Sequence, residues 1–417
     1  MLRISSLRFV FYSPEKSVVT QVRELSVSPS TDLSDLVLAL PEGNYKLVVI
    51  ANPTPKLVAR TAVGSPLSQL TGYEHYYTDE LATQGSQLTV SLLNEQGPVT
   101  VTSAAFSSTT PQVRIQMESV LARVLVYGEP RLAGGAKRGS APAGYVLSPQ
   151  ARYTAPLRPL GLLRTGGSEV AGDGSHPEDR YPTSRMCQEW KDSAPKSLTE
   201  LLSHFALDRM TSHEGGEDIY QARLLPDEQA LATAVSNIHA YARETTLPPT
   251  AYLVGALPSL VIRFPYIPGG LTLRENEGWV SFRGKYYTES QMKEWIRSDD
   301  FDDPTLAEAV KAARINEDSF TAPFEKGDLR FYYRGYNYYV VPIRHFDDTK
   351  APTKTSIGRY GVVRGTEYRI HLTQILRPGT PVPPDLTADL TPVAEEKNVH
   401  AIVSVRPIVV HSSEIHI

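Results

Sequence analysis

Residues 213–217, with the sequence HEGGE, begin like the zinc-binding helix of a metalloprotease. Such a site needs a second histidine four residues after the first, so that both rings lie on one side of a helix. Glu217 stands at that position, and the two adjacent glycines would weaken the helix that sets the spacing. We therefore predict neither a metal site nor catalysis at this run.

Two other groups of polar residues carry metal-ligand or acid–base side chains. Residues 298–305, with the sequence SDDFDDPT, hold four aspartates, but their spacing fits no calcium loop and is typical of a helix N-terminus. His345 and Asp347 lie two residues apart, so they share one face of an extended chain. They could form a metal or acid–base pair, although a polar strand end is favoured because no third ligand or nucleophile accompanies them.

The remaining signals for enzymatic chemistry are weak. The sequence has no Gly-rich phosphate loop and no GxSxG nucleophile motif. The single cysteine, Cys187, excludes an internal disulfide and is expected to be an inert thiol. Residues 330–341, RFYYRGYNYYVV, could stack sugars or bases, but a hairpin turning near Gly335 is favoured. We expect no enzyme, no cofactor, no metal and no catalytic residue.

Composition narrows the class of protein further. The net charge of −4 and the pI near 6.2 argue against a nucleic-acid partner. No stretch of the sequence approaches the roughly 18 apolar residues of a membrane span. The sequence opens on a strand-like run and not on a signal peptide. The protein is then either cytosolic or has lost a leader.

The elements that must position these residues are mostly strands. Leu7, Phe9 and Phe11 alternate along one strand, and residues 113–126 form a longer one whose phase changes near Val120, which predicts a bulge. Residues 160–200 are rich in Gly, Ser, Pro and charge, which is typical of a long surface loop or of a flexible stretch at a domain boundary.

Helical patterns occur in the second half. We expect helices over 226–243, over 288–296 with a capping box from Thr288 to Gln291, and from Asp303. At 417 residues the chain is too long for one ordinary core. We therefore predict a mainly β protein of two β-sandwich domains, spanning 1–158 and 159–417, the second decorated with short helices.

The C-terminal third resembles a known family, the fimbrillins, which are subunits of type V pili. The resemblance depends on a tyrosine-rich strand ending in PIRH (342–345), on YGVVR (360–364) followed by Tyr368, and on the turn from Gly379 to Pro381. Gly365 stands where the family usually has asparagine, and both residue types tolerate positive φ. Moderate similarity extends to the N-terminal strands and to the end of the chain.

The resemblance implies transthyretin-like sandwich domains and a surface structural role. Such proteins are exported as lipoprotein precursors to the outer membrane, and an arginine-specific protease removes the leader and the first strand. The C-terminal strand of a neighbouring subunit then fills the resulting groove, so that subunits polymerise head to tail into an adhesive fimbria. The implied partners are other fimbrial subunits, accessory tip and anchor proteins, and host or bacterial surfaces, and the mature form does not span the membrane.

Residue patterns predict which residues form the donor strand and which line the acceptor groove. In the terminal run, Pro407 cannot donate to a sheet ladder, so it marks a bend. The part before it is expected to stay in its own domain, and the part after it to enter a neighbouring subunit. The predicted donor residues are Val403, Val405, Ile408, Val410, Ile415 and Ile417. The predicted acceptor groove contains Leu7, Phe9, Phe11, Val120, Ala122, Val124 and Val126.

Two alternatives remain open at this point. The terminal strand could stay docked within its own subunit until polymerisation. The protein could also be a tip or accessory adhesin that binds host glycan or protein without extending the fibre.

Overall fold

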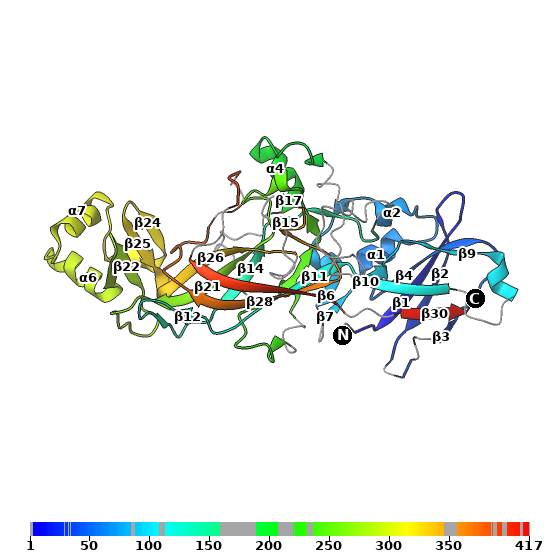
Figure 1. Cartoon of the computed structure of the whole chain (residues 1–417), viewed down its shortest axis with the longest axis horizontal. Coiled ribbons are helices and arrows are strands. Elements are labelled where there is room, and N and C mark those ends of the chain that lie inside the picture. Colours follow the sequence, from blue (N-terminus) through cyan, green and yellow to red (C-terminus); the bar gives the residue numbers. More distant parts are fainter. Residues whose placement is uncertain are drawn as a thin grey trace.

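The computed structural model of the chain is an elongated, mainly β molecule (Figure 1). It describes residues 3–28, 30–31, 33, 35–84, 88–107, 113–158, 189–206, 220, 222–231, 237–345, 357–384, 386, 390–393, 398–408 and 412–416. The mainly β class predicted from the sequence is confirmed, and so are short helices in the second half.

The helices of the described residues are short. The α-helices are α1 (Pro55–Arg60), α2 (Ser68–Thr71), α4 (Leu198–His204), α6 (Glu289–Ser298) and α7 (Pro304–Ala312). The 3-10 helices are η1 (Thr78–Glu80), η2 (Ser103–Ser107), η5 (Ile238–Ala240), η6 (Pro249–Ala251), η7 (Glu317–Thr321) and η8 (Tyr333–Gly335).

The N-terminal third builds an eight-stranded sheet, in the order β2-β1-β4-β8-β10-β30-β3, with β9 beside β4. Its strands are β1 (Ser6–Tyr12), β2 (Val19–Ser26), β3 (Asp35–Val37), β4 (Tyr45–Ala51), β8 (Leu92–Asn94), β9 (Val99–Val101), β10 (Val113–Ser119) and β30 (Ser412–His416). One strand of this sheet, β30, therefore comes from the opposite end of the chain.

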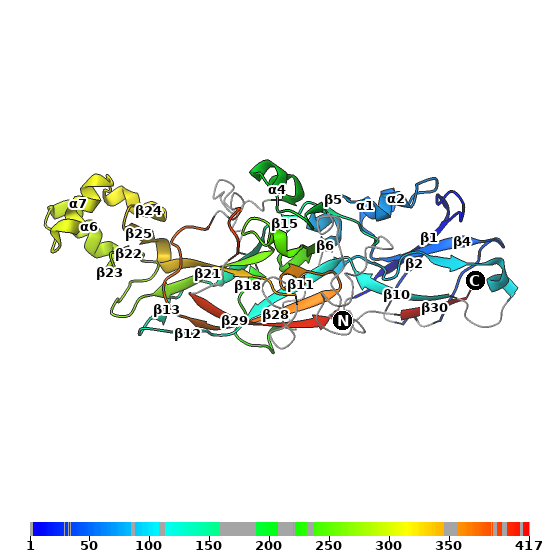
Figure 2. The same ribbon diagram turned by 45° about the horizontal axis from the view of Figure 1, so that its top comes forward.

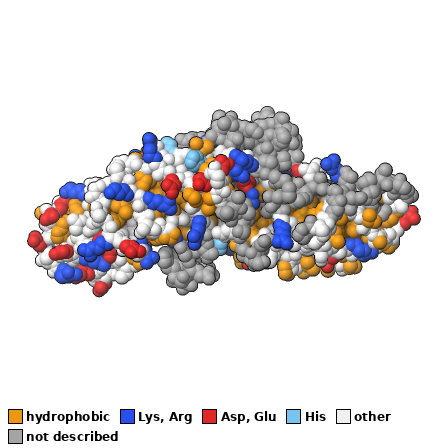
Figure 3. All heavy atoms as spheres, turned by 90° about the horizontal axis from the view of Figure 1, so that it is seen from below, with side chains coloured by type: hydrophobic (Ala, Val, Ile, Leu, Met, Phe, Trp, Pro, Cys, Tyr) orange, Lys and Arg blue, Asp and Glu red, His pale blue; other side chains and the backbone are white. Residues whose placement is uncertain are grey.

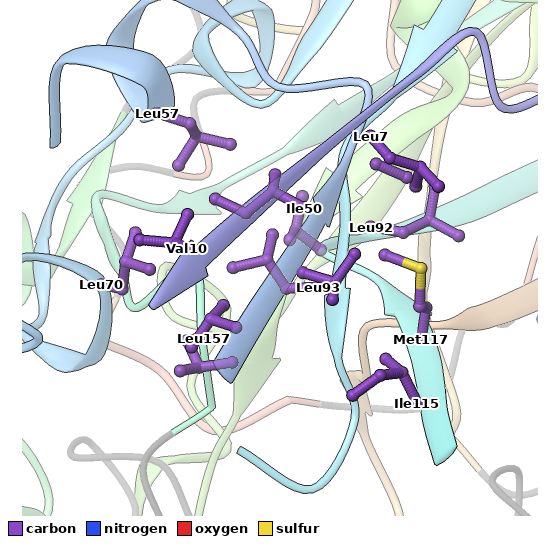
Figure 4. Packing of buried hydrophobic residues seen from close by; sticks show 14 of the residues in the cluster. Leu7, Val10, Ile50, Leu57, Leu70, Leu92, Leu93, Ile115, Met117 and Leu157 are labelled. Atoms are coloured by element: carbon purple, nitrogen blue, oxygen red, sulfur yellow. The ribbon is translucent and has the colours of Figure 1, made fainter. Parts of the chain in front are cut away.

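Both faces of the N-terminal sheet are covered, as Figure 4 shows. Val10 of β1 points toward Leu57 of α1 and Leu70 of α2, whereas Leu7 and Met117 lie toward the other face. This arrangement explains why β1 is buried on both sides and reads as a nearly continuous apolar run.

Two five-stranded sheets form the second half around a common core. One has the order β12-β28-β11-β19 with β29 beside β28, and the other has the order β13-β21-β14-β18 with β26 beside β21. Their strands are β11 (Leu121–Tyr127), β12 (Arg131–Leu132), β13 (Lys137–Arg138), β14 (Gly144–Ser148), β18 (Ala222–Arg223), β19 (Tyr241–Arg243), β21 (Ser259–Ile267), β26 (Tyr336–Pro342), β28 (Thr366–Ile375) and β29 (Val399–Pro407).

Smaller sheets complete the molecule. Four are two-stranded pairs, β6 (Ala82–Gln84) with β7 (Leu88–Val90), β5 (Glu74–His75) with β16 (Tyr153–Thr154), β15 (Gln150–Ala151) with β17 (Phe205–Ala206), and β20 (Thr245–Thr246) with β27 (Gly361–Val362). The fifth, of β22 (Trp279–Phe282), β23 (Lys285–Thr288), β24 (Phe324–Lys326) and β25 (Leu329–Tyr332), packs with α6 and α7 around a core of its own at one end of the molecule (Figure 1).

The long strand predicted over residues 113–126 is divided between two sheets. It breaks at Val120, so that β10 pairs with β8 and β30 while β11 pairs with β19 and runs parallel to β28. The Ser119 side chain bonds to the Leu121 backbone at this break, and the phase change in the sequence is the signal of it. The predicted boundary at residue 158 does not coincide with this division, because β11 to β14 precede it and pair within the second half.

Two local predictions from the sequence are wrong. The tyrosine-rich run is not a hairpin, because β25 pairs with β22 and β24 while β26 pairs with β21. The helix expected over 226–243 does not reach its predicted end, because residues 238–243 form η5 and β19, where Tyr241 is buried against the first core. By contrast, the capping box from Thr288 to Gln291 opens α6 as predicted.

Candidate functional site

The candidate site is the position of β30 inside the N-terminal sheet, between β10 and β3. β30 runs antiparallel to β10, with Ile415 opposite Val113 and Ser413 opposite Ile115. It runs parallel to β3, with Ile415 opposite Leu36. We call the space between β10 and β3 the strand slot.

The strand slot has buried apolar walls and strand edges that β30 covers. Val113, Ile115 and Leu36 on its walls are buried in the first core. If β30 left, the first half of β10 and the whole of β3 would lose these strand partners, and their backbone groups would become open edges. Unpaired edges beside apolar side chains are costly and bind another strand readily. Seen from below, hydrophobic side chains gather on this half of the molecule, whereas charged ones crowd the end that carries α6 and α7 (Figure 3).

The two C-terminal strands occupy different halves of the molecule. β29 pairs along its length with β28, where Val405 stands opposite Tyr368, and it ends at Pro407. The next residue, Ile408, is buried in the first core, and its N–H donates to the Gly365 carbonyl at 2.8 Å. The chain therefore changes sheets directly after Pro407, and Figures 1 and 2 show β29 and β30 in different parts of the molecule.

The predicted donor residues are divided by this change of sheet. Val403 and Val405 lie in β29 and pack with the second core, so they belong to the home strand. Ile408 lies at the crossing, and Ile415 is part of β30 in the slot. Val410 and Ile417 fall outside the described residues.

The predicted acceptor residues are not brought together. Leu7, Phe9 and Phe11 are in the first core, but β4, β8 and β10 separate their strand from β30. Val120 also belongs to the first core, at the break between β10 and β11.

The other three predicted acceptor residues, Ala122, Val124 and Val126, belong to the second core. These three residues do not line the strand slot, because β11 pairs with β19 and β28 in the second half. The predicted acceptor set does not include the slot residues Val113, Ile115 and Leu36. The alternation of 113–117 was a usable signal for β10, but the three residues of β3 are too few to show a period.

A buried ionic cluster joins the two halves next to Val120. The Arg158 Nη2 atom lies 3.1 Å from Glu118 Oε2 and 3.3 Å from Glu244 Oε1. The Arg364 Nε atom lies 2.9 Å from Glu244 Oε2, and its Nη1 donates to the Pro156 carbonyl at 2.9 Å. Breaking a buried pair of this kind leaves an uncompensated charge, so the cluster fixes how the two halves meet.

The two carboxylates of the cluster have opposite pKa shifts. Burial raises the pKa of Glu118 to about 7, although Arg158 and Arg364 oppose the shift. Burial acts in the same direction on Glu244, but Arg364 and Arg158 together hold its pKa below the usual value. Glu244 accepts from both arginines, whereas the salt bridge of Glu118 is to Arg158.

The residues first considered for chemistry do not form a metal or catalytic centre in the described part of the chain. No group of three or more metal-ligating side chains occurs there. Asp303 caps α7 through the Thr305 N–H, as expected of a helix N-terminus. Residues 213–217, Asp347 and Cys187 lie outside the described residues.

Comparison with known proteins identifies part of the chain. Residues 330–414 match the family model described as "Major fimbrial subunit protein type IV, Fimbrillin, C-terminal". The match assigns this segment to the fimbrillin C-terminal domain, and that family is one of fimbrial structural proteins and not of enzymes.

The other comparisons are less informative. No curated protein matches the sequence. Fimbrilin FimA of Porphyromonas gingivalis W83 is 14% identical, with a TM-score of 0.41 over 97% of this chain and 91% of that chain. A candidate cell adhesion protein of Parabacteroides distasonis ATCC 8503 is 12% identical, with a TM-score of 0.43 over 97% and 94%. One from Bacteroides eggerthii DSM 20697 is 12% identical, with a TM-score of 0.41 over 99% and 91%. The assignment depends on the family model and not on these scores.

The motif residues of the fimbrillin segment have structural roles. The buried Tyr368 hydroxyl accepts from the Val363 N–H and lies 2.8 Å from His345 Nδ1. Gly365 has φ of +70°, as the glycine–asparagine exchange predicts. A Cβ atom on Gly379 would lie 2.3 Å from the Tyr338 carbonyl oxygen, so a side chain does not fit there. Together these contacts hold the start of β28 and the turn after it.

Proposed function

We propose that this protein is a structural subunit of a fimbria and that it polymerises by exchanging β30 between subunits. The observation that carries the proposal is the position of β30. It completes the N-terminal sheet, although it follows a strand that belongs wholly to the second half. A strand that fills a slot in its own chain makes the same contacts when it fills the slot of another copy.

The exchange produces fibres for geometric reasons. The donor strand and the slot are different surfaces, so the contact between subunits is heterologous and does not close on itself. Each subunit offers one slot and one strand, which gives head-to-tail growth. The ionic cluster around Arg158 keeps both halves of a subunit in fixed orientation, so the fibre transmits force through folded domains.

The wider scheme follows the fimbrillin family. We propose that the precursor is exported as a lipoprotein and that a strand preceding this sequence occupies the slot until a protease removes it. β30 of the same chain or of a neighbour then takes its place. The resulting fimbria supports adhesion and biofilm formation, with accessory tip and anchor subunits at its ends. No helix within the described residues is long and apolar enough to cross a membrane.

The proposal is tested by removing residues 412–417. We expect the shortened protein to keep a folded second half, by circular dichroism, but to form no fibres in electron microscopy. A synthetic peptide of residues 408–417 should bind the shortened protein and not the full chain, because only the shortened one has an empty slot.

A matched peptide with Ser413→Pro is the control. β30 is an internal strand, so its N–H groups point to β10 or to β3, and proline removes one ladder hydrogen bond wherever it is placed. This peptide should bind at least about tenfold more weakly, a loss of about 1.4 kcal/mol. Fibres that still form without residues 412–417 would show that β30 is not the donor.

A further inference from the structure

Ile408 lies where the chain leaves the second half, and both halves hold it. Its side chain is 3% exposed and belongs to the first core. Its backbone N–H donates to the carbonyl of Gly365 at 2.8 Å, and the N–H of Gly365 donates in turn to the carbonyl of Leu121 at 3.3 Å. Ile408 therefore joins the end of β29 both to the N-terminal core and to the residue that precedes β28.

The burial of Ile408 sets it apart from the rest of the C-terminal third. Among the residues from 242 to 408 whose side chains the structure describes, Ile408 alone belongs to the first core. The slot, by contrast, is filled by β30, whose residues 412–415 pair with β10 and whose residues 414–416 pair with β3. The Ile408 side chain is thus part of the core of the acceptor half, although the sequence pattern grouped it with the donor strand.

The position of Ile408 is fixed by β29. Pro407, the last residue of β29, stands opposite Thr366, and the bond from Ile408 to Gly365 extends this ladder by one residue pair. Neighbouring Cα atoms are only about 3.8 Å apart, so Ile408 cannot enter another subunit unless the end of β29 separates from β28. Long pairing over a packed core makes such a separation costly.

We propose that Ile408 is a fixed anchor, which stays in its own subunit while β30 is exchanged. The inference rests on the proposed strand exchange and adds the point at which the exchanged part of the chain begins. A donor brings only the residues after Ile408 to its neighbour, because the neighbour's own Ile408 already fills the corresponding place in the first core. The acceptor therefore keeps this part of its core closed while its slot is empty.

The anchor also limits how far β30 can slide in a slot. Four peptide units join Ile408 to Ser412, and they span at most about 14 Å. A slip by one residue turns the side chains of a strand to the opposite face of its sheet. A fixed point close to β30 limits slips that would carry the strand away from Ile408, which favours the register with Ser412 opposite Gln116.

The first test follows the Ile408 amide by hydrogen exchange and NMR after ¹⁵N-isoleucine labelling, in the full chain and in the chain that lacks residues 412–417. The Ile370 amide in β28 is the matched reference for the stability of the second half. We expect the ratio of the Ile408 and Ile370 exchange rates to change by less than about threefold, because the bond to Gly365 does not involve β30. A larger increase in the ratio would overturn the proposal.

The second test adds peptides of residues 408–417 to the shortened chain and follows binding by fluorescence anisotropy. The Ile408→Ala peptide should bind within about threefold of the unchanged peptide, whereas the Ser413→Pro peptide should bind at least about tenfold more weakly. If Ile408→Ala weakens binding as much as Ser413→Pro does, Ile408 travels with the donor and the anchor is wrong. If no peptide binds, the strand exchange itself fails, and the ratio of amide exchange rates alone decides whether Ile408 is held without β30.

Discussion

The two strands that end the chain, β29 and β30, show opposite relations to the fold. β29 is paired with β28 from Val399 to Pro407, within the sandwich built by its own part of the chain. β30 has only five residues, and it lies in a sheet whose other strands come from the first 120 residues. The difference shows how one continuous segment can contain both a permanent part of a domain and a part that can be exchanged.

Different interactions hold the two strands. The sheet around β29 is fixed by long pairing, by the buried Tyr368 and by the fimbrillin motif residues around it. β30 depends on short pairings with β10 and β3. A strand with few ladder pairs opens at a lower cost than a long strand that pairs along its whole length.

The largest expected effect is on the free energy of unfolding and comes from substitutions in the core of the second half, to which β29 belongs. Tyr368→Ala should lower the free energy of unfolding by about 3–5 kcal/mol, because it empties a fully buried aromatic position in the second core. Tyr368→Phe keeps the ring and removes the hydroxyl that accepts from the Val363 N–H, and it should cost about 1–3 kcal/mol. Urea denaturation measures both values. A loss below about 1 kcal/mol for the alanine variant would contradict the permanent role of this sheet.

A second prediction concerns the junction between the halves, and it is a pH dependence. The folded protein holds a proton on Glu118 up to about pH 7, whereas the unfolded chain releases it near 4.5. The folded state therefore binds more protons between these values, and the contribution of Glu118 to the free energy of unfolding falls as pH rises from about 4.5 to about 7.

Glu118→Gln should flatten this part of the stability curve, measured by denaturation at several pH values. The depressed pKa of Glu244 acts below that window, where its contribution is lost as pH falls. Comparing the variant with the native protein cancels the titrating groups that lie outside this ionic cluster. Curves of equal slope between pH 4.5 and 7 would be incompatible with a buried, protonated Glu118.

The smallest expected effect is a difference in amide exchange rate between β30 and β29, and it needs no mutation. Backbone amides of β30 should exchange with deuterium at least about tenfold faster than the amides of β29 that are bonded to β28, because β30 can leave the slot while the rest stays folded. Mass spectrometry of peptides from the two strands measures this in the monomer. Equal protection would mean that β30 opens only with global unfolding.

The sequence by itself determined the features that depend on neighbours along the chain. Alternation marked β1 and β10, the capping box marked the start of α6, and Gly365 marked a turn with positive φ. Pro407 marked the end of β29, because a residue without an N–H cannot continue a ladder. These signals are local, so they need no knowledge of the partner strand.

Tertiary structure alone decided which strands meet. Apolar alternation says that Val124 is buried, but not that β11 lies beside β28 instead of at the slot. For the same reason the sequence did not reveal β3 and did not show that the tyrosine-rich β26 pairs with β21. It also left open whether the end of the chain stays in the second half. Strand pairing is chosen by contacts between distant segments, and many partners satisfy one local pattern. The slot filled by β30 is therefore a property of the fold.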